Sequence, residues 1–316
     1  MPDAQNSGVL APICTHFQEN GDLDLDALRC NIEKYNASGL AGYVVGGSTG
    51  ESALLEKDET LKLLAAVRDA AGAGMMLVAG TGAESVRETV KLSNAAADLG
   101  YHAALVLTPH YYRGQMARPE SQLGFFHAVA DSAKIPILIY DFPLVTGIDL
   151  PAAVVRQMAA HQNIIGVKES SADLEKIKSM ICGVPSGFKV YVGPSAKYHA
   201  CLCLGATGGI LAIGNALPYS TVAIDRKFRA GDVDGSRQAQ ERIVEAAGVA
   251  PKYGLQGLKY AMDLKGFRGG PARLPLLPLD AQQKQEIEAL FEQIEDGPCG
   301  AAPPVRGRPP GRPADA

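Results

Sequence analysis

The stretch "NIIGVKESSAD" (residues 163–173) poses the central question of the fold, because an apolar run ends in a lysine. Residues 164–167 have the composition of a buried β-strand, and Lys168 then brings an amine to its end. Burying an ammonium is costly unless it is paired. Either the strand ends there and the lysine reaches solvent, or the lysine stays inside, where an apolar environment favours a neutral, nucleophilic amine.

Seven further apolar runs of similar length accompany this one, and together they decide the fold. They lie at 9–15, 42–47, 75–82, 103–109, 135–143, 189–193 and 208–215. Nearly continuous hydrophobicity is typical of parallel strands covered on both faces. Segments with helical periodicity, such as 57–71 and 84–99, lie between the runs. Eight β–α units predict an α/β protein with a (β/α)8 TIM barrel, and a doubly wound open sheet is the alternative.

The chain continues past the eighth unit with three more helical segments, at 233–248, 253–265 and 280–296. They predict a small C-terminal helical appendage on the barrel. We therefore expect a barrel at 1–230, a helical segment at 231–296 and a tail at 297–316. The tail is rich in Pro, Gly, Ala and Arg, so it has too little apolar surface to form a core and is predicted to be disordered.

Composition narrows the class of protein. Hydrophobic residues make up 47% and charged residues 20% of the 316 residues, which is typical of a globular protein. A net charge of −4 argues against a nucleic-acid partner, and no apolar run is long enough to span a membrane. The start of the chain lacks the order of a signal peptide. Six cysteines without a C-x-x-C pair indicate reduced thiols in a cytoplasmic protein. The six histidines show no metal-binding spacing, so no metal is expected.

Polar side chains gather where the predicted strands end, which is where a (β/α)8 barrel has its active site. Each has an ordinary explanation alone, such as a packed tyrosine or a helix-capping hydroxyl. Together they converge on one mouth: Ser48, Thr49 and Glu51 after the second strand, Tyr111 and Tyr112 after the fourth, Tyr140 in the fifth and Lys168 in the sixth.

This set of groups suits a 2-keto acid as the small-molecule substrate. A neutral amine attacks a ketone, and a nearby phenol can move the proton that imine formation requires. Hydroxyl and backbone N–H groups bind the carboxylate beside the ketone. The segment "GGSTGE" (46–51) offers both, and its glycines let the backbone approach a ligand closely.

Five motifs occur together: "GGSTGES", "AGTGAES", "TPHYYR", "YDFPLVTGIDL" and "IIGVKESSAD". In this order they resemble the dihydrodipicolinate synthase / N-acetylneuraminate lyase superfamily of class I aldolases, over about residues 8–296. The resemblance implies that Lys168 forms a Schiff base with pyruvate or a pyruvate-yielding substrate, with Tyr140 as the acid/base. It implies no cofactor.

The same resemblance assigns roles to the other residues at the mouth. Thr49 would link Tyr140 to Tyr111, which relatives commonly receive from the neighbouring subunit of a tight dimer. We therefore expect a homo-oligomer, a homotetramer built as a dimer of dimers. Contacts with the keto acid are expected from the hydroxyls of Ser48 and Thr49 and from the backbone near Gly193 and Ile210.

The substrate is suggested by one missing and several matching features. Dihydrodipicolinate synthases normally carry an arginine where this chain has Val145, and valine cannot bind a carboxylate in a bidentate manner. "TPHYYRGQM", "IIGVKESSAD" and "YGLQGLKYAMDLKGFRGGPARLPL" are most similar to mitochondrial-type 4-hydroxy-2-oxoglutarate aldolases. By that resemblance Ser170 binds substrate, and Arg113 is the candidate for its second carboxylate. Asp141 replaces the Asn or Ser of relatives, and a second acid there could discourage dianionic substrates.

Several alternatives stay open at this stage. The first is a 4-hydroxy-tetrahydrodipicolinate synthase, which condenses pyruvate with aspartate semialdehyde. The second is a lyase of another 2-keto-3-deoxy sugar acid. A non-catalytic barrel is disfavoured by the intact set of Lys168, Tyr140 and Thr49. A metal-dependent aldolase would require Asp, Glu or His ligands at the strand ends.

Overall fold

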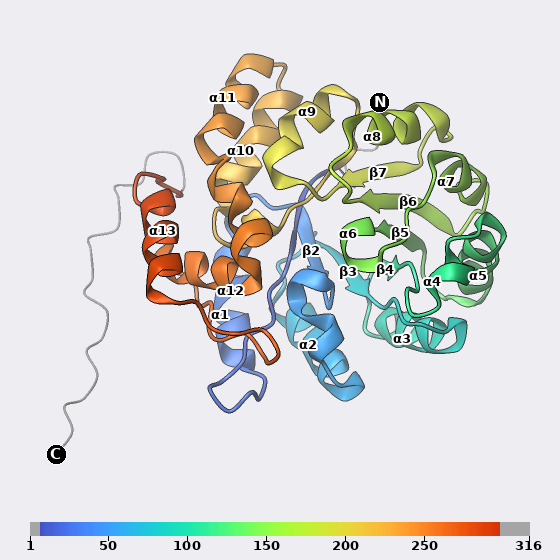
Figure 1. Cartoon of the computed structure of the whole chain (residues 1–316), viewed down its shortest axis with the longest axis horizontal. Helices are drawn as coiled ribbons and strands as arrows, with labels where there is room; N and C mark the ends of the chain where they lie inside the picture. Colours follow the sequence, from blue (N-terminus) through green and yellow to red (C-terminus); the bar gives the residue numbers. More distant parts are fainter. Residues whose placement is uncertain (1–6, 298–316) are drawn as a thin grey trace.

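The computed structural model describes residues 7–297, and at its centre eight parallel strands form a barrel that closes when β1 pairs with β8 (Figure 1). The TIM barrel prediction is therefore confirmed, and the open-sheet alternative is wrong. The strands are β1 (Gly8–Pro12), β2 (Gly42–Val45), β3 (Met76–Gly80), β4 (Ala103–Leu107), β5 (Ile137–Asp141), β6 (Ile164–Glu169), β7 (Lys189–Val192) and β8 (Gly208–Ile210).

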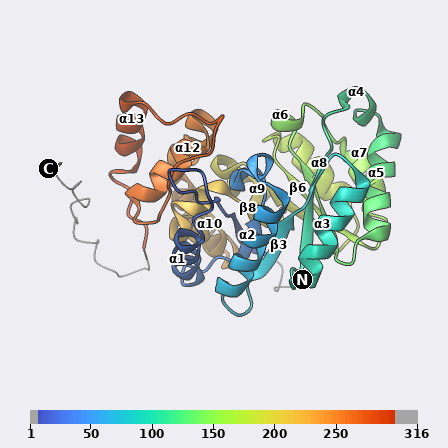
Figure 2. The same cartoon turned by 90° about the horizontal axis from the view of Figure 1, so that it is seen from below.

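Helices follow the strands and surround the barrel (Figure 1). The helices of the barrel are α1 (Leu25–Asn36), α2 (Lys57–Ala70), α3 (Val86–Asp98), α5 (Pro119–Ser132), α7 (Ala152–Met158), α8 (Leu174–Gly183), α9 (Tyr198–Cys203) and α10 (Pro218–Arg229). Two short helices, α4 (Arg113–Met116) and α6 (Pro143–Thr146), come after β4 and β5. Both lie toward the same side of the barrel (Figure 2), as expected where the carboxyl ends of the strands meet.

The strands bury side chains on two faces, which explains their continuous hydrophobicity. In β5, Ile137 and Ile139 join the large core between the strands and the helices, whereas Leu138 and Tyr140 join a smaller cluster inside the barrel. Successive side chains of a strand point to opposite faces, so this alternation follows from the backbone. It directs the Tyr140 ring to the barrel interior.

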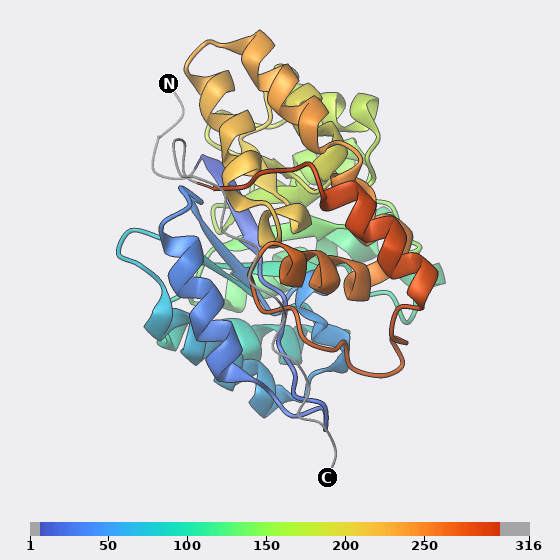
Figure 3. The same cartoon turned by 90° about the vertical axis from the view of Figure 1, so that its left-hand side faces the viewer.

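Three helices complete the chain: α11 (Val233–Ile243), α12 (Val249–Leu264) and α13 (Ala281–Phe291). α11 packs against α10, and α12 packs against α13 beside the barrel (Figure 3). The predicted helical appendage is thus present. The division at residue 230 stays a prediction, and the predicted disordered tail lies outside the described residues except for Gly297.

Element ends differ from the sequence prediction where side chains bond to the backbone. The eighth strand was expected to reach residue 215 but ends at Ile210, because Asn215 turns the chain. Its amide donates to the carbonyls of Pro12 and Ala212, both at 2.9 Å, and its oxygen accepts from the Cys14 N–H at 3.2 Å. The helix expected at 280–296 ends at Phe291. No helix among residues 7–297 is long and apolar enough to cross a membrane.

Candidate active site

Lys168 and Tyr140 lie side by side inside the barrel at the carboxyl ends of β6 and β5. They are register partners in the sheet, and both are buried, with exposed fractions of 5% and 4%. The Lys168 Nζ lies 4.1 Å from the centroid of the Tyr140 ring. It makes no hydrogen bond or ion pair with any described residue. Lys168 therefore does not reach solvent, and its nitrogen is not engaged by a counter-ion.

The Ser48–Thr49 segment forms a tight 3-10 turn, Ser48–Gly50, after β2. A Cβ on Gly50 would lie 2.9 Å from the Ile13 carbonyl oxygen, so only glycine allows the turn to pack this closely on the segment that follows β1. The half-buried hydroxyls of Ser48 and Thr49 have no hydrogen-bond partner among residues 7–297. Backbone N–H groups at the start of a helical turn also lack an internal acceptor. The turn can therefore donate to a carboxylate.

Ser170 follows Lys168 on the next inward-facing position and has a buried hydroxyl without a hydrogen-bond partner. A Cβ on Gly193 would lie 2.1 Å from the Ser170 Oγ, so a side chain at 193 would displace this hydroxyl. Ile210 belongs with Tyr140 to the cluster inside the barrel. The structure thus brings Ser170, Gly193 and Ile210 close to the Lys168 end of the barrel, as the sequence suggested, while their contacts with substrate stay predictions.

Tyr111 lies outside this group in the single chain. Its side chain is 77% exposed and packs edge-on against Tyr112, with ring centroids 5.1 Å apart. The Tyr111 N–H donates to Glu84 at 2.9 Å. Within the described residues no hydrogen bond joins Thr49 to either Tyr140 or Tyr111. The expected Thr49–Tyr140–Tyr111 relay is therefore not assembled within one chain.

Arg113 lies next to the segment that contains Val145. It opens α4 and is exposed, and a Cβ on Gly147 would lie 3.2 Å from the Arg113 Cζ. The guanidinium therefore packs over the end of α6, two residues from Val145. Val145 itself is 46% exposed. A cation is thus available near the position where the usual arginine is missing.

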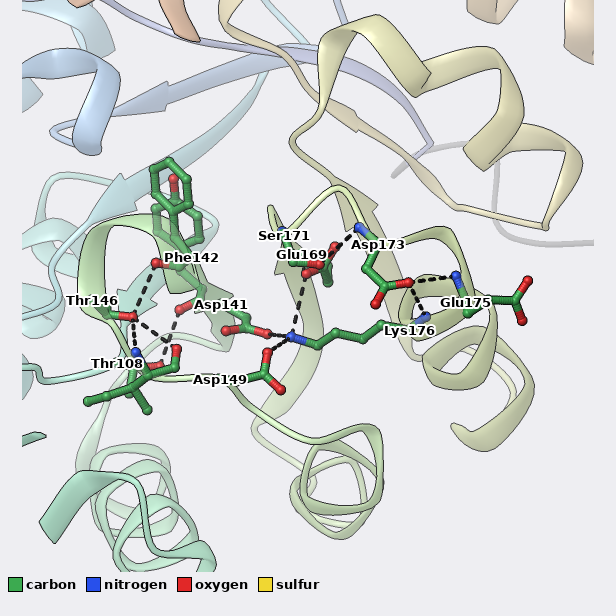
Figure 4. Close-up of polar contacts among 12 residues, drawn as sticks. Thr108, Asp141, Phe142, Thr146, Asp149, Glu169, Ser171, Asp173, Glu175 and Lys176 are labelled. Atoms are coloured by element: carbon green, nitrogen blue, oxygen red, sulfur yellow. Dashed lines mark hydrogen bonds and ion pairs between the residues drawn. The ribbon is translucent and has the colours of Figure 1, made fainter. Parts of the chain in front are cut away.

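Asp141 points away from the mouth, so it is not placed to repel a dianionic substrate as the sequence suggested. Asp141 and Glu169 are register partners one residue beyond Tyr140 and Lys168, and both are fully buried. Lys176 of α8 lies behind them (Figure 4). Its Nζ is 2.5 Å from Asp141 Oδ2 and 3.6 Å from Glu169 Oε1, and it also binds Asp149.

We call this group the Lys176 cluster; its members are Asp141, Asp149, Glu169 and Lys176. It contains three carboxyl groups but only one ammonium. Burial raises the pKa of Asp141 to about 7 despite its contact with Lys176. Burial also raises the pKa of Glu169. Burial acts against the charged form of Lys176, but the three carboxylates outweigh it and raise its pKa. Strand alternation alone predicts that Asp141 and Glu169 face the helices, and this signal was available in the sequence.

A second buried ion pair ties the Ser48–Thr49 turn to the C-terminal helices. Glu51 follows the turn with a φ of +56°, and its Oε1 lies 2.5 Å from the Nζ of Lys259 in α12. Its other oxygen accepts from the Arg273 N–H at 2.9 Å. Both side chains of the pair are almost fully buried. The C-terminal segment therefore supports the turn expected to hold the substrate carboxylate.

A cavity of about 1090 Å³ lies at the other end of the barrel. It is lined by residues that precede or start strands, among them Met76, His102, Pro136 and Lys189. It contains none of the predicted site residues. Within residues 7–297, no group of three or more His, Cys, Asp or Glu side chains is arranged to hold a metal ion.

The profile of the Dihydrodipicolinate synthetase family matches residues 5–294. A 4-hydroxy-tetrahydrodipicolinate synthase of an Exiguobacterium species is 32% identical over 92% of this chain and 98% of its own. A probable mitochondrial 4-hydroxy-2-oxoglutarate aldolase of Emericella nidulans is 33% identical over 91% of this chain and 95% of its own.

Solved structures agree with this family. A prophage protein of the dihydrodipicolinic acid synthase family from E. coli K12, crystallised with pyruvate, has a TM-score of 0.86 and 28% identity, over 92% of this chain and 99% of its own. A monomeric dihydrodipicolinate synthase variant has a TM-score of 0.86 and 25% identity, over 92% of this chain and 98% of its own. This fold therefore occurs in a protein described as monomeric.

Proposed function

The chain belongs to the dihydrodipicolinate synthetase family and is a class I aldolase, and we propose that it cleaves 4-hydroxy-2-oxoglutarate to pyruvate and glyoxylate. The observation that carries the chemistry is the buried Lys168 Nζ, 4.1 Å from the Tyr140 ring and without an ion pair among the described residues. We assign Lys168 as the Schiff-base lysine and Tyr140 as the group that moves protons beside it.

In the proposed reaction the Lys168 amine adds to C2 of the keto acid, and loss of one water gives a protonated imine. The C3–C4 bond then breaks. Its electron pair moves toward the imine to form an enamine, and the C4 hydroxyl loses its proton as glyoxylate leaves. Protonation of C3 and addition of water to the imine release pyruvate and restore the amine. Tyr140 is the proposed proton shuttle, and the Ser48–Thr49 turn is proposed to hold the carboxylate beside C2.

The choice of substrate rests on the surroundings of Val145. The valine offers no charge, whereas the Arg113 guanidinium packs over nearby Gly147 and could bind a second carboxylate there. The unpartnered, buried Ser170 hydroxyl is a further candidate to bind the substrate. The 33% identity to a probable 4-hydroxy-2-oxoglutarate aldolase agrees with this choice.

The second candidate function is 4-hydroxy-tetrahydrodipicolinate synthase, which condenses pyruvate with aspartate semialdehyde. It is favoured by the relatives from Exiguobacterium and Methanothrix thermoacetophila, at 32% and 33% identity, which carry that name. Val145 counts against it, because valine cannot make the bidentate, charge-assisted contact with a carboxylate that an arginine makes.

A substrate panel separates the candidates. It would follow pyruvate release or consumption with 4-hydroxy-2-oxoglutarate, aspartate semialdehyde plus pyruvate, N-acetylneuraminate and 2-keto-3-deoxy sugar acids. We expect kcat/KM to be highest for 4-hydroxy-2-oxoglutarate, and Val145→Arg to raise the condensation with aspartate semialdehyde. Efficient condensation by the unmodified protein, with no cleavage of 4-hydroxy-2-oxoglutarate, would establish the second candidate instead.

We also propose that the protein works in the cytoplasm as a homo-oligomer, a dimer of dimers. The exposed rings of Tyr111 and Tyr112 support an interface at this edge of the barrel, because large exposed aromatic side chains are typical of one. Mixing inactive Lys168→Ala and Tyr111→Phe chains tests whether Tyr111 enters a neighbour's site. Hybrids that form but recover no turnover would remove Tyr111 from that role.

A further inference from the structure

The backbone connects the two proposed catalytic side chains to a pair of acids behind them. Asp141 follows Tyr140 in β5, and Glu169 follows Lys168 in β6. Tyr140 is in register with Lys168, and Asp141 is in register with Glu169. Side chains alternate along a strand, so each acid lies on the opposite face from its catalytic neighbour. One peptide unit joins the two residues, and a shift of the acid therefore moves its neighbour. The positions of the two acids on the outer face therefore affect the positions of Tyr140 and Lys168 on the inner face.

One cation holds these two acids together. Lys176 Nζ lies 2.5 Å from Asp141 Oδ2 and 3.6 Å from Glu169 Oε1, and its side chain is 12% exposed. It also binds Asp149, in the segment that returns from β5 toward α7 (Figure 4). Three carboxylates from three segments thus meet one ammonium.

Among residues 7–297, no other cation is paired with Asp141 or Glu169. Asp141 Oδ1 and Glu169 Oε2 are buried and have no hydrogen-bond partner. Glu169 Oε1 accepts only the Ser171 N–H, at 2.7 Å, in addition to its contact with Lys176. Without Lys176, the two buried acids on adjacent strands would either repel each other or take up a proton, and in both cases the contact that ties the strand ends to α8 would be lost.

We propose that Lys176 is a positioning residue, which fixes the ends of β5 and β6 from behind and thereby sets Tyr140 against Lys168. Lys176 belongs to α8, whose first turn is held by Asp173: its side chain accepts from the N–H groups of Glu175 and Lys176. The ammonium is therefore anchored to a capped helix, which a short loop connects to β6. This inference rests on the proposed roles of Lys168 and Tyr140.

The test compares three variants of the full chain. Lys176→Met removes the cation, Lys176→Arg keeps it, and Lys178→Met removes an exposed lysine of the same helix as a control. The first measurement is the rate at which pyruvate and borohydride label Lys168. The second is kcat and KM for the best substrate of the panel.

We expect Lys176→Met to lower the labelling rate and kcat by about 10–10²-fold, since small misplacements of reacting groups have effects of this size. KM should change less than about threefold, because the Ser48–Thr49 turn is untouched. Lys176→Arg should recover most of the rate, and Lys178→Met should match the unmodified protein. If Lys176→Met lowers kcat only in proportion to its folded fraction, and Lys176→Arg does not recover the rate, then Lys176 contributes to stability alone and the inference is wrong.

A second variant keeps the inference testable if Lys176→Met does not fold. Asp141→Asn/Glu169→Gln/Lys176→Met removes all the charge from the strand ends while keeping similar volumes. It should fold but label slowly, because the tie to α8 is gone; labelling at the unmodified rate would overturn the inference.

If the unmodified protein itself forms no adduct, the proposed function fails and this inference with it. If it forms one and Lys176→Met does so equally fast, only the positioning role fails.

Discussion

Lys168 and Lys259 are both nearly fully buried, with exposed fractions of 5% and 1%, but their surroundings differ. The Lys259 ammonium binds Glu51 at 2.5 Å and the Pro271 carbonyl at 2.8 Å. The Lys168 nitrogen faces the Tyr140 ring and has no such partner in residues 7–297. A paired buried lysine is explained by structure alone, whereas an unpaired one calls for another explanation. We attribute the difference to function.

The largest effect should come from Lys168→Met, which replaces the amine by an apolar side chain of similar length. Turnover should fall by at least about 10⁴-fold, because no other nucleophile lies at this position. The free energy of unfolding should stay within about 1 kcal/mol or increase, since an unpaired amine leaves the barrel. Steady-state kinetics and urea denaturation measure the two. A stable variant whose turnover falls by clearly less than about 10⁴-fold would contradict the comparison.

Tyr140→Phe should have the next largest effect. It keeps the ring beneath Lys168 and removes only the hydroxyl, so the fold and the amine stay in place. Loss of a positioned acid/base typically lowers the rate by about 10²–10⁴-fold, and the loss should appear in kcat. Near-normal turnover in this variant would show that the phenol only packs against the lysine.

Lys259→Met should affect stability and spare the chemistry. It leaves the Glu51 carboxylate buried without its cation, which typically costs about 3–5 kcal/mol. Lys252→Met is the matched control on α12, because Lys252 is 64% exposed and its ion pair should contribute at most about 1 kcal/mol. Both variants should still form the pyruvate adduct on Lys168. A Lys259→Met protein as stable as the control would contradict a structural role for the pair.

The smallest expected effect is a change in how the stability of the fold depends on pH, and it comes from Asp141 on the outer face of the barrel. Burial raises the pKa of Asp141 from 3.8 to about 7, so folding favours its protonated form. This contribution to stability is complete below about pH 4 and is lost as pH rises through 7. The groups that face Asp141 are Lys176, Glu169 and Asp149.

Asp141→Asn removes this titration. The difference in Tm between the variant and the unmodified protein should therefore shift in favour of the variant between about pH 5 and pH 8. Thermal unfolding across this range measures it. A pH-independent difference would mean that the proton is held elsewhere in the Lys176 cluster.

Much of the barrel was predictable from the sequence, because it depends on local patterns. Continuous apolar runs marked all eight strands, and the position of Lys168 at the end of one marked the site. The end of the eighth strand was not predictable, because Asn215 bonds to residues near the start of the chain. The ion pair between Glu51 and Lys259 could not be predicted from local sequence patterns either, because the fold brings together residues that are far apart in the chain.

The site was predictable in part. Tyr140 and Lys168 follow from strand alternation and the chain order of the barrel. The sequence suggested that Asp141 could discourage dianionic substrates, because it is adjacent to Tyr140. It faces the helices instead and meets Lys176, which only the packing of α8 brings near. Tyr111, exposed in one chain, depends on an assembly that a single chain does not contain.

The central claim is that Lys168, and neither of the paired buried lysines, carries the covalent chemistry. Its most direct test is reduction of the unmodified protein by borohydride in the presence of pyruvate, followed by peptide mapping of every lysine. We expect one reduced pyruvate adduct per chain, on Lys168, with Lys176 and Lys259 unlabelled. Labelling of another lysine with Lys168 untouched, or no labelling at all, would contradict the account.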